Sequence, residues 1–163
     1  MKEKTEREAL LQLTALCAKG EHCSYEMEEK LRKWGIDEAA QARIMAYLTK
    51  EHYIDDERYC RAYIRDKIQY GKWGRRKIEQ GLYLKRIDRD ISSPLLDEVD
   101  DEEYLRVLRP LLKAKWRTIK GGSDYERSGK LIKYALQRGF TFDIIRQCID
   151  GADEHDFDDG TDD

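Results

Sequence analysis

Three stretches of this chain share one spacing, in which an apolar residue is followed by three residues, a turn position and a second apolar residue. They are Leu31–Ile36, Leu82–Ile87 and Ala135–Phe140. A second pattern is offset from these, because the acidic segment Asp55–Tyr59 returns as Asp100–Tyr104, 45 residues later. This period predicts that one supersecondary unit is used several times, since such a unit buries its apolar face only against stacked neighbours.

Each unit carries the signals of three helices. In the first unit, apolar residues recur at helical spacing from Lys4 to Lys19, from Ser24 to Gly35, and after Asp37. Ser24 and Asp37 are residue types that cap helix N-termini, and Gly35 stands where a helix C-terminus needs a left-handed residue. The unit is therefore predicted to be a three-helix repeat.

Three positions depart from the repeating pattern. Arg86 takes the place of the turn glycine, and Gly81 lies inside the preceding helix, where it costs up to about 1 kcal/mol relative to alanine. We therefore expect the second unit to end differently or to flex. Pro110, within the first helix of the third unit, predicts a kink or a shorter helix.

The composition agrees with an all-helical fold. Charged and hydrophobic residues each make up 40% of the chain, only two prolines occur, and leucine, lysine, glutamate and arginine greatly outnumber isoleucine and valine. We predict an all-α protein of three tandem three-helix repeats, with about nine helices in an elongated, curved array. The predicted repeats are residues 1–54, 55–99 and 100–149, followed by an acidic tail over 150–163.

The N-terminus gives no sign of export. Basic and acidic residues alternate over its first eight positions, and the apolar run from Leu10 is broken by Gln12 and Thr14. No stretch approaches the roughly 20 apolar residues needed to cross a bilayer. We therefore expect a cytoplasmic protein without a membrane partner, whose four cysteines are reduced thiols: Cys17, Cys23, Cys60 and Cys148.

The net charge of −3 conceals an uneven distribution. From Asp150 onward the chain holds eight acidic residues and no lysine or arginine, so residues 1–149 carry 31 basic against 26 acidic side chains. Such a tail cannot bury enough apolar surface to offset its ordering entropy, and we expect it to be disordered. Two roles stay open for it: a mimic of a polyanion on the basic body, or a solubilising appendage.

Residues that could catalyse a reaction are scarce. His22 lies between Cys17 and Cys23, but this spacing matches no zinc site and no second ligand pair follows. The Asp55-Asp56 pair precedes a predicted helix, where capping explains it better than metal binding. The segment from Gly71 to Gly74 lacks the Lys-Ser/Thr of a phosphate-binding loop. We predict no enzymatic activity and no cofactor.

Two basic segments carry the strongest functional signal. Arg58–Arg89 holds eleven lysines and arginines against three acidic residues, and Arg106–Arg138 holds ten against two. Their helical spacing places cations opposite the apolar stripe, where they could neutralise phosphates or carboxylates. Aromatic residues interleaved with these cations, such as Trp73 and Trp116, would suit stacking on bases or anchoring a protein interface.

A plainer interpretation stands beside this one, because charged runs on helices are usually solvated faces and tyrosines at helical spacing are usually core. We assign Tyr59, Tyr63 and Tyr104 to the core. Trp73, in a loop between two glycines and several cations, stays open between core and contact.

One part of the sequence resembles a known family. The residues that carry the likeness are Asp55, Asp56, Tyr59, Tyr63, Lys67, Gly71, Gly74, Ile78 and Leu82. With the flanking segments Ser24–Ile36 and Lys130–Phe140, they resemble RecX, the bacterial regulator of the recombinase RecA. The likeness extends from about Glu8 to Ile149 and leaves out the acidic tail.

This resemblance implies a repeat protein that lies in the helical groove of the RecA nucleoprotein filament. Such proteins mainly inhibit the recombinase, ATPase and co-protease activities of the filament, and they also bind single- and double-stranded DNA. We expect a monomer. The candidate contacts with DNA or the filament, chosen by charge, are Arg58, Arg61, Arg65, Lys67, Lys72, Trp73, Arg75, Arg76, Lys77, Lys130, Lys133 and Arg138.

Two other functions stay open. The chain could be a general DNA-binding repeat protein that affects a recombinase only by competing for DNA, or a helical scaffold for an unrelated acidic partner. Binding to naked DNA as tight as binding to the filament would favour the first. The absence of both kinds of binding would favour the second.

Overall fold

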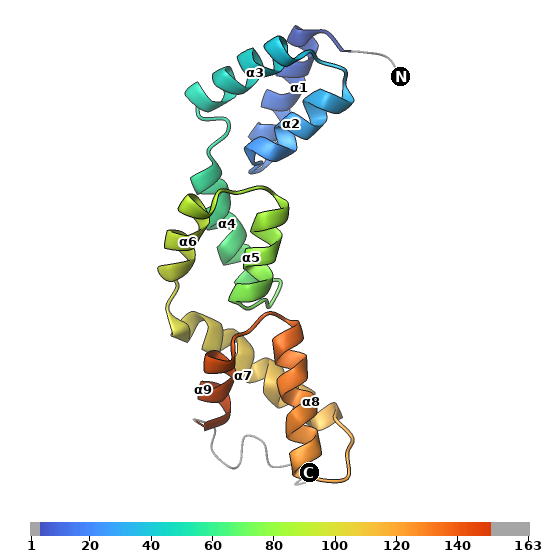
Figure 1. Cartoon of the computed structure of the whole chain (residues 1–163), viewed down its shortest axis with the longest axis vertical. Coiled ribbons are helices and arrows are strands. Elements are labelled where there is room, and N and C mark those ends of the chain that lie inside the picture. Colours follow the sequence, from blue (N-terminus) through green and yellow to red (C-terminus); the bar gives the residue numbers. More distant parts are fainter. Residues whose placement is uncertain (1–3, 151–163) are drawn as a thin grey trace. The chain divides into compact units, whose positions relative to one another are not determined.

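The computed structural model describes residues 4–150, and all regular secondary structure in this range is helical (Figure 1). The prediction of an all-α fold is confirmed, whereas the acidic tail lies outside the described residues except for Asp150. The helices are α1 (Glu6–Lys19), α2 (Ser24–Lys33), α3 (Glu38–Lys50), α4 (Asp56–Gln69), α5 (Arg75–Leu84), α6 (Arg89–Asp97), α7 (Asp101–Thr118), α8 (Asp124–Gln137) and α9 (Phe142–Asp150).

The three echoing stretches form one and the same helix ending. In Leu31–Ile36, Leu82–Ile87 and Ala135–Phe140, the amide of the last residue donates to the carbonyl of the first, at 3.1, 3.0 and 3.2 Å. The amide of the fifth residue donates to the carbonyl of the second, at 3.1, 2.9 and 2.9 Å. These paired bonds define a Schellman motif, which satisfies carbonyls that the helix itself leaves free. Helices α2, α5 and α8 therefore end alike.

Arg86 adopts the backbone conformation of the glycine that it replaces. Gly35 and Gly139 have φ values of 72° and 94°, and Arg86 has a φ of 55°. The expectation that the second unit ends differently is therefore wrong. The two Schellman bonds hold Arg86 in this region although it costs a residue with a side chain about 1–2 kcal/mol. Its guanidinium lies 4.8 Å from the ring centroid of Tyr25, a favourable cation–π contact.

Helix starts follow the predicted caps with one exception. Asp37 accepts a hydrogen bond from the Ala40 amide at 2.8 Å, as a capping residue does. Ser24, predicted as the cap of α2, is instead its first residue, and Cys23 occupies the cap position. The reason is tertiary, since the Ser24 amide donates to Asp56 at 2.8 Å.

Proline and glycine inside helices have local explanations. Helix α7 runs through Pro110, so the prediction of a shorter helix is wrong. Pro110 has no amide hydrogen to donate to the carbonyl of Arg106, but both residues lie on the exposed side of the helix. Gly81 lies in α5 against Tyr63, and a Cβ at this position would overlap the tyrosine hydroxyl. A larger residue here would therefore require the Tyr63 side chain to shift.

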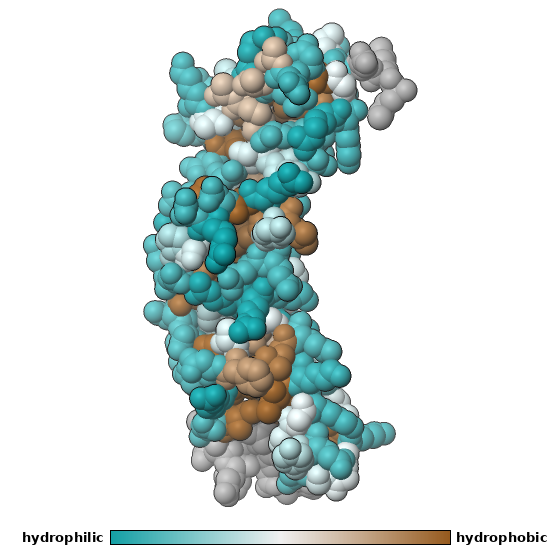
Figure 2. Space-filling model, in the orientation of Figure 1, coloured by the Kyte–Doolittle hydropathy of each residue, from teal (hydrophilic) through white to brown (hydrophobic). Residues whose placement is uncertain are grey.

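When the repeats are aligned on the three echoing stretches, Leu31–Ile36, Leu82–Ile87 and Ala135–Phe140, the aligned apolar positions form the core. Helices α1, α2 and α3 close over one apolar cluster, and α7 packs with both α8 and α9. The aligned positions in the second and third helices of each repeat, and in the turn between them, are buried, with Ile91 half-buried: Met27, Ile78, Leu131, Leu31, Leu82, Ala135, Ile36, Ile87, Phe140, Ala40 and Ile144. On the face drawn in Figure 2, hydrophilic residues cover most of the helices, as amphipathic packing requires.

The chain divides into two compact units. Within the described residues, one contains those up to Tyr63 together with Gly81–Leu95, and the other contains Ile64–Gln80 together with those from Leu96 to Asp150. The boundaries fall inside α4, α5 and α6. The middle group of helices therefore contributes to both units.

Candidate cationic interface

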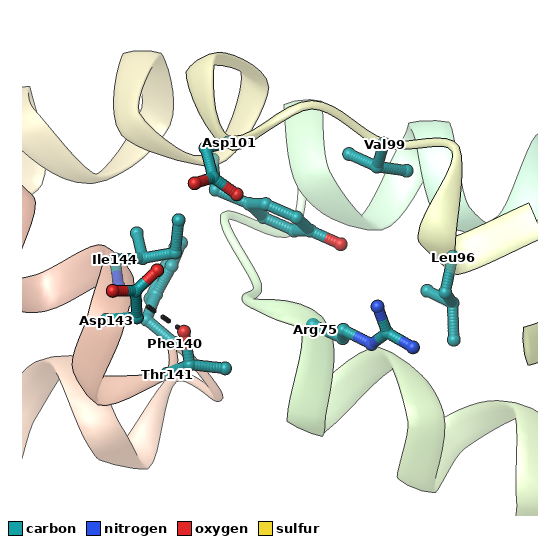
Figure 3. A pocket seen from close by; sticks show the side chains of 9 residues that line it. Arg75, Leu96, Val99, Asp101, Phe140, Thr141, Asp143 and Ile144 are labelled. Carbon is teal, nitrogen blue, oxygen red and sulfur yellow. Dashed lines mark hydrogen bonds between the residues drawn. The ribbon is translucent and has the colours of Figure 1, made fainter.

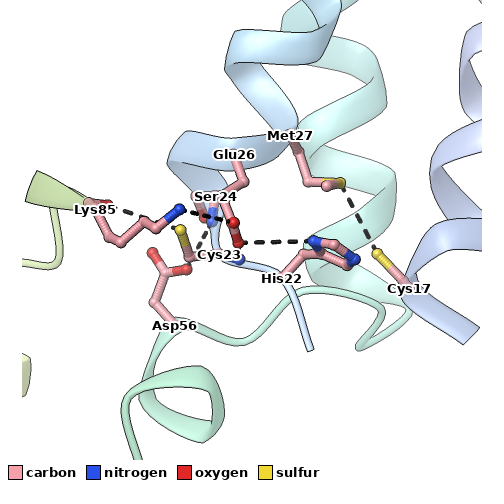
Figure 4. Close-up of polar contacts among 8 residues, drawn as sticks. All are labelled: Cys17, His22, Cys23, Ser24, Glu26, Met27, Asp56 and Lys85. Atoms are coloured by element: carbon pink, nitrogen blue, oxygen red, sulfur yellow. Dashed lines mark hydrogen bonds and ion pairs between the residues drawn. The ribbon is translucent and has the colours of Figure 1, made fainter. Parts of the chain in front are cut away.

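The first unit contains a junction between the start of α2 and the turn after α5 (Figure 4). The Lys85 ammonium lies 3.0 Å from a carboxylate oxygen of Glu26, and the Cys23 thiol donates to the Lys85 carbonyl at 3.7 Å. The amide of Cys23 also donates to Glu26 at 3.0 Å. Burial raises the pKa of the Cys23 thiol to about 11, so it is a packing group rather than a nucleophile.

The second unit contains the equivalent junction, between the start of α5 and the turn after α8. The Gly74 amide donates to the Arg138 carbonyl at 2.9 Å, and the Arg76 amide donates to the Gly139 carbonyl at 3.0 Å. A Cβ at Gly74 would lie 2.5 Å from the carbonyl carbon of Gly139 and would overlap the backbone of Phe140. Glycine is required because two backbones approach each other directly.

Charge distinguishes the two junctions. By the repeat alignment, Glu26 and Lys85 of the first junction correspond to Lys77 and Arg138 of the second. An ion pair in one is thus replaced by two cations in the other, so the second junction carries surplus positive charge. Surplus positive charge on a surface attracts anions.

The ammonium group of Lys77 lies over the ring of Trp73. The ammonium groups of Lys77 and Lys67 each lie 4.7 Å from the centroid of the Trp73 ring, and the indole is half-buried. Lys72 and Arg76, beside this ring in sequence, are exposed and form no ion pair within residues 4–150. We name Lys67, Lys72, Trp73, Arg76 and Lys77 the tryptophan cluster.

The side chain of Arg138 forms hydrogen bonds with the loop that precedes α5. Its guanidinium donates to the carbonyls of Gly71 and Lys72, both at 3.1 Å, and lies 5.6 Å from the ring centroid of Tyr134. Lys72 has a φ of 58°, so this loop is strained and Arg138 holds it. Arg138 therefore positions the tryptophan cluster.

Arg75 faces a small recess instead of the open surface (Figure 3). The recess, of about 190 Å³, places Arg75 and Leu96 across from Phe140 and Thr141. The Arg75 guanidinium lies 2.8 Å from a carboxylate oxygen of Asp97. Arg75 was predicted as a contact residue, but its positive charge is already neutralised by Asp97.

Tyr104 also lines this recess, and it is buried, as the sequence predicted. Burial raises the pKa of its hydroxyl to about 12, because the phenolate would be poorly solvated. Tyr59 is likewise buried, and Tyr63 is half-buried. These tyrosines serve the cores.

Three other candidates on α4 have carboxylate neighbours. Arg58 is paired with Glu21, Arg61 lies 3.1 Å from Glu57, and Arg65 lies 3.9 Å from Asp66. All three side chains are exposed. Exposed pairs of this kind contribute about 0–1 kcal/mol, so they can exchange for a ligand anion.

Lys130 and Lys133 belong to a separate surface on α8. With Lys115 and Lys120 they line an open groove of about 360 Å³, whose lining contains no carboxylate. Lys115 and Lys120 were missed as site residues because the sequence does not indicate that the end of α7 faces the middle of α8. We name these four lysines the lysine groove.

Aromatic residues divide between core and surface. Trp116, a predicted surface anchor, is only 6% exposed and lies beneath Arg127, whose guanidinium is 3.9 Å from the ring centroid, so that prediction is wrong. Tyr70, Tyr83 and Tyr125 are exposed. They remain available for stacking.

No helix between residues 4 and 150 is long and apolar enough to span a bilayer. Tandem three-helix groups, joined by repeating junctions and bearing cationic surfaces, define the chain as a helical-repeat protein. Comparison with protein families makes this specific. The second three-helix domain of RecX matches residues 55–93 and the third matches residues 101–149, so the chain belongs to the RecX family.

Relatives along most of the chain carry the name regulatory protein RecX. Regulatory protein RecX of Vibrio campbellii is 28% identical over 148 residues, which cover 91% of this chain and 92% of the relative. Regulatory protein RecX of Acinetobacter baylyi is 29% identical over 144 residues, covering 86% and 85% of the two chains. The resemblance of the sequence to RecX is thereby confirmed.

Solved structures share the fold. The crystal structure of RecX from Lactobacillus salivarius superposes with a TM-score of 0.82 at 23% identity, covering 90% of this chain and 95% of that one. A second crystal structure of regulatory protein RecX gives a TM-score of 0.81 at 19% identity, covering 89% and 73%. The tandem three-helix architecture is therefore that of RecX.

Proposed function

We propose that this protein binds the RecA nucleoprotein filament in its groove and mainly inhibits its recombinase, ATPase and co-protease activities. Membership of the RecX family supports this proposal. The observation that supports a particular binding surface is the charge of the second junction. There Lys77 and Arg138 stand in place of an ion pair and leave surplus positive charge beside Trp73. A filament presents DNA phosphates and acidic protein groups together, which such a surface would recognise.

The tryptophan cluster is our choice for the filament contact. Its exposed cations, Lys72 and Arg76, form no ion pair within residues 4–150, so binding a partner breaks no ion pair of these side chains. Arg58, Arg61 and Arg65 are secondary candidates because each must first leave a carboxylate. Arg75 and Arg138 act by positioning the loop and helix that carry the cluster.

The test measures RecA-dependent ATP hydrolysis and strand exchange on single-stranded DNA as this protein is added. We expect both to fall, and the Lys72→Glu/Arg76→Glu variant to need at least ten times more protein. The matched control is Arg106→Glu/Arg146→Glu, which changes two exposed arginines away from the cluster and should inhibit as the unaltered protein does. No effect of the unaltered protein on either activity would refute the proposal.

General DNA binding is the second candidate, and the lysine groove favours it. In that case the protein would bind naked DNA as tightly as it binds a pre-formed filament at the same salt concentration. A pull-down on both, side by side, separates inhibition at the filament from simple competition for DNA.

A further inference from the structure

The recess in front of Arg75 lies where the repeating junction is not closed. In the first unit, the carboxylate of Asp56, at the start of α4, accepts a hydrogen bond from the Ser24 amide at the start of α2. In the second unit the counterparts are Asp101 and Arg75, at the starts of α7 and α5. Asp101 accepts instead from the side-chain amide of Gln147 at 3.0 Å, and Asp101 and Arg75 line a recess of about 190 Å³. The recess therefore takes the place of a contact that the first unit forms.

Negative charge is in excess on one side of the recess. Asp101 and Asp143 lie on the side opposite Arg75 (Figure 3). The amide of Gln147 donates to one oxygen of each carboxylate, at 3.0 and 3.3 Å, and the other oxygen of each lies outside this bridge. Arg75 does not balance the two carboxylates, because its guanidinium lies 2.8 Å from Asp97. The charges around the recess therefore attract a cation.

A buried hydroxyl without a partner also lines the recess. Tyr104 is only 5% exposed, and its hydroxyl forms no hydrogen bond within residues 4–150. Electrostatic interactions couple this hydroxyl to Arg75 and to Asp101, the residues on the two sides of the recess. A buried polar group without a partner destabilises the fold, and a ligand that supplies the missing hydrogen bond removes this cost.

The size and the walls of the recess fit a side chain better than a single water. Its volume is over ten times the roughly 10–15 Å³ that one water needs. The apolar walls are formed by Leu96, Val99, Phe140 and Ile144. A lysine has a hydrocarbon stem that packs on apolar surface and an ammonium that donates three hydrogen bonds. The recess offers three acceptors for it, on Asp101, Asp143 and Tyr104.

We propose that this recess receives a lysine side chain of a partner protein. The ammonium lies between the carboxylates of Asp101 and Asp143 and donates to the hydroxyl oxygen of Tyr104, while the stem packs on the apolar walls. Both carboxylates are exposed, and exposed charges hold a cation weakly, so we assign the ammonium to a partner whose other contacts share the cost of association. The inference goes beyond the proposed function, in which cations of this chain meet anionic groups.

The experiment follows the NMR signals of the isotope-labelled full chain while a blocked tripeptide with a central lysine is added. We expect saturable shifts of the methyl signals of Leu96, Val99 and Ile144, and none with the same peptide acetylated on the lysine Nζ, which removes its charge. The absence of saturable shifts up to about 20 mM lysine peptide would overturn the inference.

The carboxylates are tested with a matched pair of variants. Asp101→Asn/Asp143→Asn should bind the lysine peptide at least about ten times more weakly, because two charge-assisted hydrogen bonds are lost. The control is Glu38→Gln/Asp90→Asn, which removes the same charge from exposed first-turn positions of α3 and α6. It should bind as the unaltered protein does, and equal binding by the two variants would contradict the proposal.

A further variant tests the hydroxyl without removing a charge. Tyr104→Phe deletes only the unpartnered group, so stability in urea should not fall, whereas binding of the lysine peptide should weaken several-fold. Unchanged binding, or a loss of stability, would contradict the role given to this hydroxyl. Tighter binding of free 1,4-diaminobutane than of the peptide would assign the recess to a small amine and refute the partner lysine. RecA takes part in none of these measurements, so their failure leaves the proposed function standing.

Discussion

The amide of Gly74 donates a 2.9 Å hydrogen bond to the carbonyl of Arg138. The guanidinium of Arg138 in turn donates to the carbonyl of Gly71, which lies three residues before Gly74. One residue of the turn after α8 thus holds both ends of the loop before α5. The loop carries Lys72 and Trp73, so the geometry of the tryptophan cluster depends on this backbone contact.

The first prediction concerns the space at Gly74. Gly74→Ala should lower the free energy of unfolding by about 1–3 kcal/mol, because the added Cβ would overlap the backbone of Phe140 and must push the junction apart. Urea unfolding measures the change. The control is Gly129→Ala in α8, where nothing lies within 4 Å of an added Cβ; this variant should gain about 0.5–1 kcal/mol. Equal stability of the two variants would contradict the prediction.

The second prediction concerns the left-handed backbone at Arg86. Both Arg86→Gly and Arg86→Ala remove the contact with Tyr25, but only glycine removes the steric cost of φ 55°. The glycine variant should therefore be more stable than the alanine variant by about 1 kcal/mol. Thermal unfolding of the pair is the measurement, and an alanine variant as stable as the glycine variant would argue against a strained turn.

The third prediction is a pH dependence at Glu26. Burial alone would raise the pKa of this carboxyl, but hydrogen bonds from the Cys23 amide and the Lys85 ammonium outweigh it and hold the pKa below the ordinary 4.5. A lowered carboxyl pKa adds stability at pH values above 4.5 and loses it as the pH falls through the folded-state value. Glu26→Gln should be about 1–2 kcal/mol less stable at pH 7.

The same measurement contains its check. The gap between the unaltered protein and Glu26→Gln should close as the pH is lowered below about 4.5, because the carboxyl then becomes protonated. The control, Glu28→Gln, changes a neighbour that has no contact with Lys85. A gap that stays constant from pH 7 to pH 3 would show that charge is not its cause.

The fourth prediction concerns the acidic segment after Asp150. Residues 151–163 hold seven acidic side chains and no lysine or arginine, so removing them changes the net charge from −3 to +4. The truncated chain should bind duplex DNA several-fold more tightly at 50 mM salt, with a steeper salt slope, because screening weakens the competing charges as salt rises. Replacing the seven residues by asparagine and glutamine should have the same effect if charge, and not length, is the cause.

Local features of this fold could be predicted from the sequence. Asp37 caps α3 and Gly35 takes a left-handed conformation, as expected, since each depends on a few neighbouring residues. The prediction that Ser24 caps α2 was wrong because its amide donates a hydrogen bond to Asp56, 32 residues away. Arg86 was predicted wrongly because propensity alone does not show that the surrounding hydrogen bonds outweigh the cost of its conformation.

The sequence by itself determined the repeating unit, its helix ends and its buried positions, because helical periodicity and capping are encoded within a few turns of chain. It also determined the excess of cations in the second and third repeats. Only the tertiary structure decided which of those cations are available: Arg75 meets Asp97, and Arg138 meets Lys72 across 66 residues, while Lys115 and Lys120 join Lys130 and Lys133 in one groove. Charge is a property of the residue, but its neutralisation depends on neighbours that only folding brings close.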